Sequence, residues 1–271
     1  MKKCKFVFDL DATVLQVIEV NVEKTLELLN RKFGNEFVER HSINASGYLH
    51  MVFPGFYELF KWLKDNGHEI IFYSSGIKER NEEAVKKIME KSIGKYDNER
   101  VFSREDLFNA EYMRNTDEDK DEVKKVIGIY YGNKKKKLEG KVVGSKELPY
   151  TILIDDDISY SYGGEEKNFL IVAWSSYYYN GDIYREMEQY FSFNKSFYIA
   201  GLIDATLKEM INNNKPLVDC LFQLQVLNTG QDFNKNFYFP LRQNREYYEK
   251  GLEILKQINL NLTLYFDNEL E

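Results

Sequence analysis

The chain has 271 residues, and 43% of them are hydrophobic, which is enough apolar material for a packed core. Its net charge of −7 argues against a protein that binds nucleic acid without sequence preference, because such proteins present a basic face. The best apolar runs have the length of strands and fall far short of the ~20 residues of a membrane-spanning helix. We therefore expect neither a nucleic-acid nor a membrane partner.

The amino terminus and the cysteines bear on the compartment. The first three residues resemble the basic start of a signal peptide, but Asp9 and Asp11 would interrupt the apolar stretch that must follow. Cys4 and Cys220 lie near opposite ends of the chain, which fits a reducing compartment better than a disulfide framework. We therefore expect a cytoplasmic protein without a secretion signal.

Strand and helix signals alternate along the first hundred residues. An apolar run at 5–8 and another at 69–73 each predict a strand. Residues 35–52 show no clear period and are interpreted as an irregular insertion. Three amphipathic helices are predicted, and their apolar faces are, in chain order, Val22, Leu26, Leu29 and Phe33, then Phe56, Leu59, Phe60 and Leu63, then Ala84, Val85, Ile88 and Met89.

Further strands are predicted at 100–103, 150–154 and 169–173. An acidic stretch at 117–122 and a basic one at 134–137 interrupt the pattern between them. Strands that are apolar throughout and alternate with helices favour a parallel sheet covered on both faces. The expected fold class is therefore α/β, with a doubly wound, Rossmann-like parallel sheet in a three-layer arrangement.

The domain organisation follows from the places where this alternation breaks. We expect a catalytic core over residues 1–195, with a small cap insertion at about 14–53 and a second insertion at about 104–149. Helical periodicity from about residue 196 predicts a helical extension over 196–271, packed on or beside the core. No motif is assigned to its last part.

Carboxylates and a hydroxyl follow three of the predicted strands. Asp9 and Asp11 are two residues apart, so they project to the same side where the first strand ends. Ser74 and then 155–157 follow the strands 69–73 and 150–154, and open α/β sheets place their active sites at such strand ends. Taken singly, the aspartate pair could be a turn or a simple cation site, the serine a helix cap, and the acidic triplet a solvated loop.

In this order the residues resemble the motifs of the haloacid dehalogenase (HAD) superfamily. Residues 9–13 match its Asp-x-Asp-x-Thr motif, Ser74 its second motif, and Asp155-Asp156 its fourth, over roughly the first 175 residues. The resemblance implies that Asp9 is the nucleophile that forms an aspartyl-phosphate. It assigns proton transfer to Asp11 and a catalytic role to Ser74.

The same resemblance implies a metal site and a phosphate-binding lysine. Mg²⁺ is expected, held by Asp9, by the backbone carbonyl of Asp11 and by Asp156, with Asp155 nearby. Lys137 is the candidate for the lysine, with Lys136 and Lys141 behind it, and a solvated charge run is the alternative. Substrate binding is assigned to Thr13, Ser75 and Gly76, and no chemistry is assigned to His41, His50 or His68, the last of which is interpreted as a turn residue.

An aspartate at position 11 is typical of phosphatases and phosphomutases in this superfamily, not of dehalogenases or P-type ATPases. Residues 54–60 and 100–105 resemble the C-terminal-domain and NLI-interacting-factor-like phosphatases, which act on phosphoproteins. The sequence departs from that branch at 74–76 and lacks a proline after the fourth motif. The expected function is a magnesium-dependent phosphomonoester hydrolase, specifically a protein phosphatase acting on phosphotyrosine or on phosphoserine and phosphothreonine.

Two alternatives remain open. The middle insertion could be a lid, and the protein would then be a phosphatase of small phosphomonoesters. The chain could also be a catalytically inactive HAD fold that binds a partner through its aromatic carboxyl-terminal region.

Overall fold

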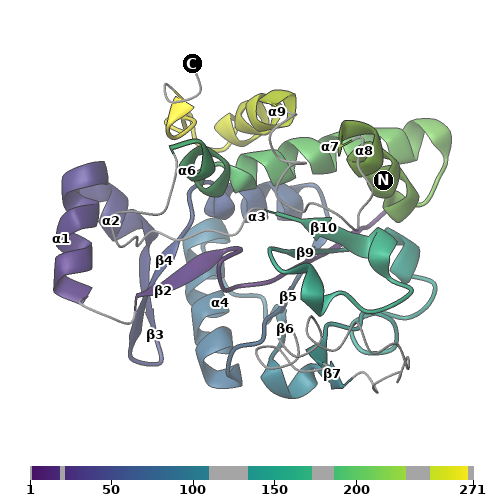
Figure 1. Cartoon of the computed structure of the whole chain (residues 1–271), viewed down its shortest axis with the longest axis horizontal. Coiled ribbons are helices and arrows are strands. Elements are labelled where there is room, and N and C mark those ends of the chain that lie inside the picture. The colour runs from purple at the N-terminus through teal and green to yellow at the C-terminus, as the bar shows by residue number, and fades with distance from the viewer. Residues whose placement is uncertain (1, 19–21, 110–133, 173–185, 230–244, 268–271) are drawn as a thin grey trace, which may run out of the picture.

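The computed structural model describes residues 2–18, 22–109, 134–172, 186–229 and 245–267. At its centre lies a five-stranded sheet in which every neighbouring pair is parallel (Figure 1). The strands are, in spatial order, β10 (Phe169–Ile171), β9 (Thr151–Asp155), β1 (Lys5–Phe8), β5 (Glu69–Tyr73) and β6 (Arg100–Phe102).

The chain builds this sheet outward from β1 in both directions. It first adds β5 and β6 on one side of β1 and later adds β9 and β10 on the other. This is the doubly wound order, and it brings the carboxyl ends of β1, β5 and β9 together next to the point where the winding reverses. The predicted α/β fold with a central parallel sheet is confirmed.

Both faces of the sheet are buried, which explains why its strands are apolar throughout. Phe6 and Phe8 pack on one face against α3 (Phe56–Asp65), α4 (Lys78–Ile93) and the later helices. Val7 lies on the other face, where it joins Leu107, Leu138 and Val142. Among the described residues this second face is covered by loops and by two short 3₁₀ helices, Leu148–Tyr150 and Ile158–Tyr160.

The segment between β1 and α3 contains more regular structure than the sequence predicts. After β2 (Leu15–Ile18) and the predicted helix α1 (Val22–Phe33), the chain forms α2 (Asn35–His41), β3 (Ser42–Ala45) and β4 (Tyr48–Val52). The three strands make an antiparallel sheet in the order β2-β4-β3. The prediction of an irregular insertion at 35–52 is therefore wrong. It failed because a strand of four or five residues is too short to show a clear period.

The hairpin turn in this segment does have a local cause. Ser46 and Gly47, between β3 and β4, both have positive φ, 50° and 80°. Two positive φ values fit the primed turns that join antiparallel strands with a two-residue loop. We call residues 14–53 the cap segment.

The second expected insertion is described only in part. Its described ends form β7 (Phe108–Asn109), which pairs with β8 (Lys134–Lys135) in an antiparallel ribbon. The acidic stretch at 117–122 lies outside the described residues. The last residue of the strand expected at 169–173 also lies outside the described residues, since residue 173 is not described.

The carboxyl-terminal part is helical, as expected, and packs on the sheet. It contains α6 (Glu186–Phe193), α7 (Lys195–Asn213), α8 (Leu217–Thr229) and α9 (Arg245–Lys256), and α7 to α9 lie together above the sheet in Figure 1. Residues of α7, α8 and α9 belong to the same hydrophobic core as β1 and α3. The domain boundary at residue 195 stays a prediction.

Helices α7 and α9 touch backbone to backbone. A Cβ at Gly251 of α9 would lie 1.7 Å from the carbonyl oxygen of Phe197 in α7, and one at Gly201 of α7 would lie 2.1 Å from that of Tyr247 in α9. Only glycine permits this approach.

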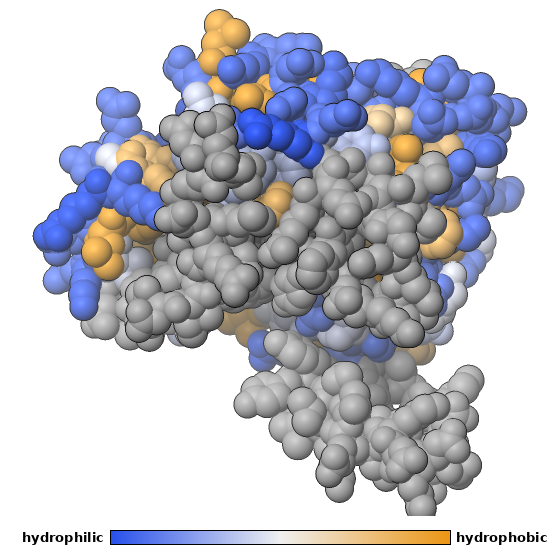
Figure 2. Space-filling model, turned by 45° about the horizontal axis from the view of Figure 1, so that its top comes forward, coloured by the Kyte–Doolittle hydropathy of each residue, from blue (hydrophilic) through white to orange (hydrophobic). Residues whose placement is uncertain are grey.

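No described helix combines the length and the apolarity needed to cross a membrane. The described part of the surface seen in Figure 2 is mostly hydrophilic, and its hydrophobic residues are scattered. The most exposed large ones in the described ranges are Leu260, Ile211 and Tyr48.

Candidate active site

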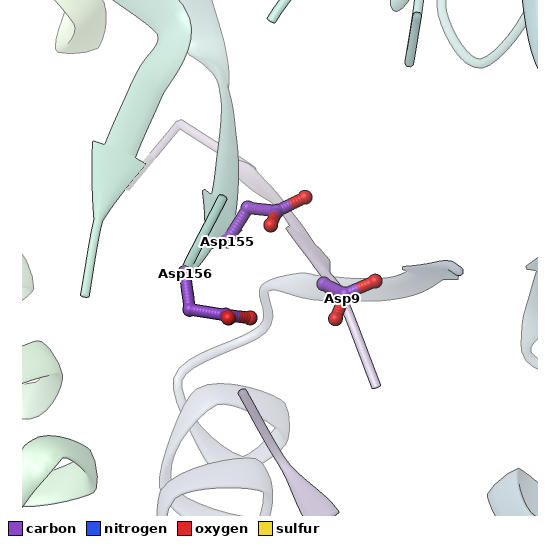
Figure 3. Close-up of side chains that lie close together, drawn as sticks. All are labelled: Asp9, Asp155 and Asp156. Atoms are coloured by element: carbon purple, nitrogen blue, oxygen red, sulfur yellow. The ribbon is translucent and has the colours of Figure 1, made fainter. Parts of the chain in front are cut away.

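Three aspartates meet at the carboxyl edge of the sheet. Asp9 directly follows β1, where its N–H donates to the carbonyl of Ile154 at 2.9 Å, and Asp155 is the last residue of β9. Carboxylate oxygens of Asp9, Asp155 and Asp156 all lie within 4.8 Å of one another. Figure 3 shows the carboxylate of Asp156 directed toward Asp9. The pairing of Phe8 with Ile154 in the sheet places the two strand ends side by side.

A buried lysine joins two of these carboxylates. Lys136 Nζ donates to Asp9 Oδ1 at 2.6 Å and to Asp155 Oδ2 at 2.5 Å, and its side chain is 0% exposed. Its backbone N–H donates to the carbonyl of Tyr160 at 2.8 Å, and its ammonium group lies 4.6 Å from the centre of the Tyr160 ring. Lys136 is therefore the buried cation that Asp9 and Asp155 share.

Lys137, the lysine favoured by the sequence analysis, lies elsewhere. Its Nζ is 5.1 Å from the ring centre of Phe108 and 4.9 Å from that of Tyr162. Lys136 forms a β-bridge with Ser161, and successive side chains of an extended segment point to opposite sides. The side chain of Lys136 points toward Asp9, and that of Lys137 points toward Phe108 and Tyr162. Lys141, the third candidate, pairs with Asp106 at 2.9 Å. The structure thus places Lys136, and not Lys137, beside Asp9.

Burial dominates the electrostatics of the cluster. It raises the pKa of Asp9 to about 7, with Asp155 and Asp11 adding to the rise and Lys136 opposing it. Burial likewise raises the pKa of Asp155 to about 6, and burial together with Asp9 raises that of Asp156 to about 7. For Lys136, burial works to lower the pKa, but Asp155 and Asp9 outweigh it and raise the pKa above its ordinary value. The cluster has more acidic groups than cations to balance them.

Thr13 positions Asp156. Its hydroxyl donates to Asp156 Oδ1 at 2.6 Å and accepts the backbone N–H of Asp156 at 3.1 Å. Thr13 is fully buried. Thr13 is expected from the sequence to bind substrate, whereas its described contacts hold the end of β9 against the turn that follows β1.

Asp11 is held outside the three-carboxylate cluster by an arginine that the sequence analysis missed. Arg80 Nη1 and Nη2 donate to the two oxygens of Asp11, each at 2.6 Å. Ser74 Oγ donates to Asp11 Oδ2 at 3.2 Å. Arg80 is buried in the first turn of α4, whereas the Asp11 side chain is 37% exposed. The sequence does contain a signal for Arg80: it is a basic residue four positions before Ala84, so it lies on the apolar face of a predicted helix, where a charged side chain needs a partner.

The loop that follows β5 accommodates this arginine. A Cβ at Gly76 would lie 1.8 Å from Arg80 Nη2, so the glycine leaves the space that the guanidinium group fills. Gly76 N–H donates to Ser74 Oγ at 3.1 Å, and the carbonyl of Ser75 accepts from Arg104 Nε at 3.0 Å. Ser75 and Gly76, expected to bind substrate, therefore lie in the loop that carries Ser74 to Asp11.

The three histidines are buried and do not belong to the carboxylate cluster, although the charges of Arg80 and Asp11 act on His50. Burial lowers the pKa of His41 to about 3 and also lowers the pKa values of His50 and His68. His68 Nδ1 accepts the backbone N–H of Cys4 at 3.3 Å, and its ring packs edge-on against Phe6. His68 is thus a packed core residue that follows a turn.

The donor set suits a hard divalent cation. All three clustered side chains offer carboxylate oxygens, and among the described residues no histidine or cysteine joins them. Both oxygens of Asp155 accept hydrogen bonds, from Lys136 and from the N–H of Asp157. Asp9 Oδ2 and Asp156 Oδ2 accept none from the described residues. Oxygens of Asp9 and Asp156 therefore remain to hold an ion.

Comparisons with known proteins leave the family unassigned. No protein-family model matches the sequence, and no curated protein matches it. The chain is similar to the structure of Fcp1, described as an essential RNA polymerase II CTD phosphatase, at 16% identity and a TM-score of 0.41, covering 98% of this chain and 64% of that one. It is also similar to fission yeast Fcp1 bound to beryllium fluoride, at 15% identity and a TM-score of 0.43, covering 97% and 68%. The chain spans about two thirds of these chains, and a similarity this weak carries no functional argument.

Proposed function

We propose that the protein is a phosphomonoester hydrolase of the HAD type that works through an aspartyl-phosphate on Asp9. One observation carries this proposal: the buried ammonium group of Lys136 lies between Asp9 and Asp155, beside Asp156, at the carboxyl edge of a doubly wound sheet. A nucleophilic carboxylate can approach an anionic phosphoryl group only where positive charge offsets the repulsion. The Lys136 ammonium group supplies part of that charge at the nucleophile itself.

The hydrogen bonds assign separate tasks to the two oxygens of Asp9. Oδ1 is held by Lys136, and Oδ2 accepts no hydrogen bond from the described residues. In the proposed first step Asp11 carries a proton; Oδ2 of Asp9 attacks phosphorus, the bond to the leaving oxygen breaks, and that oxygen takes the proton from Asp11. In the second step Asp11 takes a proton from water, the water oxygen attacks phosphorus, and the bond to Asp9 breaks to release phosphate.

Arg80 and Ser74 would position Asp11 for this proton transfer. Together they hold both oxygens of its carboxylate, and the two hydrogen bonds from Arg80 fix the plane of the group. Asp11 then has to exchange one of these hydrogen bonds for one to the leaving oxygen. We place Arg80 and Ser74 in the site as residues that position Asp11.

A magnesium ion fits the remaining oxygens of the cluster. We propose Asp9 and Asp156 as side-chain ligands, with the backbone carbonyl of Asp11, as the HAD resemblance implies. When bound, the ion neutralises charge on the phosphoryl group. Asp155, whose two oxygens are both engaged, orients Lys136 instead.

We further propose a phosphorylated protein as the substrate, because the cap segment is fastened to the core. Lys91 Nζ in α4 donates to the carbonyls of Glu39, Arg40 and Ser42 at 2.8 to 3.2 Å. The N–H of Ser46 donates to Glu83 Oε2, also in α4, at 2.6 Å. A fixed cap does not close over a small metabolite as a mobile lid does, and Asp11 stays partly exposed for a larger substrate.

Phosphate release tests the proposal. The substrates are phosphotyrosine and phosphoserine peptides beside a panel of sugar phosphates and nucleotides, each with Mg²⁺ or with EDTA, and Asp9→Asn is the control. We expect peptide turnover that requires both Mg²⁺ and Asp9. Turnover of the small phosphates alone would show a small-phosphomonoester phosphatase instead. No turnover of any substrate would contradict the enzymatic proposal and favour a binding module.

A further inference from the structure

The carboxyl-terminal helices contribute a lysine to the active-site loop. Lys195 is the first residue of α7, it is fully buried, and its Nζ donates to the carbonyl of Ala12. The same ammonium group lies 4.1 Å from the centre of the Phe53 ring. A contact across 183 positions of sequence thus ties the carboxyl-terminal part to the turn after β1.

That turn has a strained conformation. Ala12 has φ of 60°, in the left-handed region, which residues with a Cβ adopt at a cost. Its N–H donates to the carbonyl of Leu15 at 2.8 Å, and the N–H of Val14 donates to that of Leu10 at 2.9 Å. A residue in this conformation persists where its surroundings hold it. The ammonium group of Lys195 is such a restraint, because it binds the carbonyl of the strained residue itself.

The turn connects the parts of the candidate site. Asp11 precedes Ala12 and is bound by Arg80. Thr13 follows Ala12, and its hydroxyl both donates to the carboxylate of Asp156 and accepts the backbone N–H of Asp156. Loosening the turn would therefore disturb both the proton-transfer group and a proposed metal ligand.

We propose that Lys195 is a positioning residue of the active site: from the first turn of α7 it holds the Ala12 carbonyl and keeps the turn that carries Asp11 and Thr13 in its left-handed conformation. The effect on catalysis rests on the function proposed above, whereas the effect on the turn does not. The carboxyl-terminal helices would then be part of the catalytic unit, not a separate appendage.

Amide hydrogen exchange of the metal-free protein tests the proposal. Lys195→Met keeps the length of the side chain and removes the donor, and the matched control is Ser196→Ala, which removes the next side-chain hydrogen bond of α7, 2.6 Å to the carbonyl of Pro54. We expect Lys195→Met to speed exchange of the turn amides at residues 12, 14 and 15 by roughly tenfold. Ser196→Ala should leave these amides unchanged.

A second substitution separates positioning from packing. Glycine adopts positive φ without strain, so adding Ala12→Gly to Lys195→Met should slow exchange of the turn by about fivefold relative to Lys195→Met alone. A loss of packing at the start of α7 would not respond to a glycine at position 12. Lys195→Met removes a buried cation that faces Asp156 and Asp9, so some loss of global stability is expected. Urea unfolding measures this global loss for each variant, and exchange of the turn amides is compared with exchange of amides in the central strands of the same variant.

Two results would overturn the proposal: equal exchange of the turn in Lys195→Met and Ser196→Ala, or no slowing by the added glycine. Because the measurement uses neither substrate nor Mg²⁺, it stands whether or not the protein proves to be a phosphatase. If it is one, Lys195→Met should also lower kcat, and Ala12→Gly should restore part of the loss.

Discussion

Replacing Lys136 with methionine removes the cation that is shared by Asp9 and Asp155 while keeping most of the side-chain volume. The lysine is fully buried and donates to both carboxylates at 2.5 to 2.6 Å, so two buried acidic groups lose their partner at once. Removing one member of a buried ion pair costs about 3–5 kcal/mol. We expect Lys136→Met to lose about that much unfolding free energy near neutral pH.

The pH dependence of this loss can be derived from the raised pKa values. Asp9 and Asp155 titrate at about 7 and about 6 in the folded protein, above their unfolded values, and without Lys136 their pKa values rise further. A folded-state pKa above the unfolded one means that stability falls as the pH rises through that interval. The loss of unfolding free energy in Lys136→Met relative to wild type should therefore be small at about pH 5 and large at about pH 7.5.

The assay is urea unfolding followed by circular dichroism, in EDTA, at both pH values. Lys137→Met is the matched control, because the neighbouring lysine lies over the rings of Phe108 and Tyr162 and binds neither Asp9 nor Asp155, although its charge also opposes the burial that raises the pKa of Glu165. Its loss of unfolding free energy should be about 0.5–1 kcal/mol and should change much less with pH than the loss for Lys136→Met. Equal losses for the two variants, or a loss for Lys136→Met that does not grow with pH, would refute the assigned role of Lys136.

Three further predictions concern other parts of the structure. Arg80→Met should lower kcat by about 10- to 100-fold with Mg²⁺ affinity unchanged, because Asp11 loses its orientation, and Arg80→Lys should restore little since it cannot bind both oxygens. A normal kcat for Arg80→Met would contradict this role. Burial raises the pKa of Asp156 to about 7, so this carboxyl group makes wild type lose stability as the pH rises from about 4 through that value; Asp156→Asn lacks this contribution and keeps only those of Asp9 and Asp155. The melting temperature of Asp156→Asn relative to wild type, measured in EDTA, should rise over this interval, and a constant difference would argue against the buried cluster. Gly251→Ala should cost about 3 kcal/mol in urea unfolding, because its Cβ would meet the backbone of Phe197 at 1.7 Å, and a loss below about 1 kcal/mol would exclude this close packing.

The place of the site could be predicted from local sequence. Strand periodicity puts Asp9 and Asp11 on one side, and the ends of three apolar strands converge once the sheet is parallel. The structure shows that this local pattern is not sufficient, since Asp11 is bound to α4 and takes no part in the three-carboxylate cluster. The strand period does not show which of the carboxylates at the strand ends come together, because that depends on contacts with other elements, such as the contact of Asp11 with Arg80 in α4.

The lysine could not be chosen from sequence for the same reason. Four consecutive lysines occupy 134–137, and period-two alternation separates them only into two pairs. The choice is made by the bridge between Lys136 and Ser161, 25 positions later in the chain. Arg80 and Lys195 reach residues 69 and 183 positions away, and no period in a single sequence reports contacts at such distances.

The fold was predictable where elements are long or fully apolar. Strand β5 and helix α7 follow their sequence patterns closely, because burial on both faces or a long apolar stripe gives a clear signal. The strands of the cap segment were not predictable, since they have four or five residues and are stabilised by pairing with one another. The side chains of Lys87 and Lys91, which bind backbone carbonyls of this segment, add contacts from a different helix.

The aspartyl-phosphate proposed on Asp9 can be trapped and located in the chain. Asp11→Asn removes the proton transfer of both steps, but the phenolate of phosphotyrosine leaves without a proton more easily than an alkoxide does, so a phosphotyrosine peptide should still phosphorylate Asp9 while the second step stays slow. After acid quenching in the presence of Mg²⁺ and this peptide, one phosphoryl group should be found on the proteolytic fragment that contains Asp9. We expect no label when Asp9 is also replaced by asparagine. A label on the fragment that contains Asp155 and Asp156, or phosphate release by Asp9→Asn at the wild-type rate, would contradict the proposed role of Asp9.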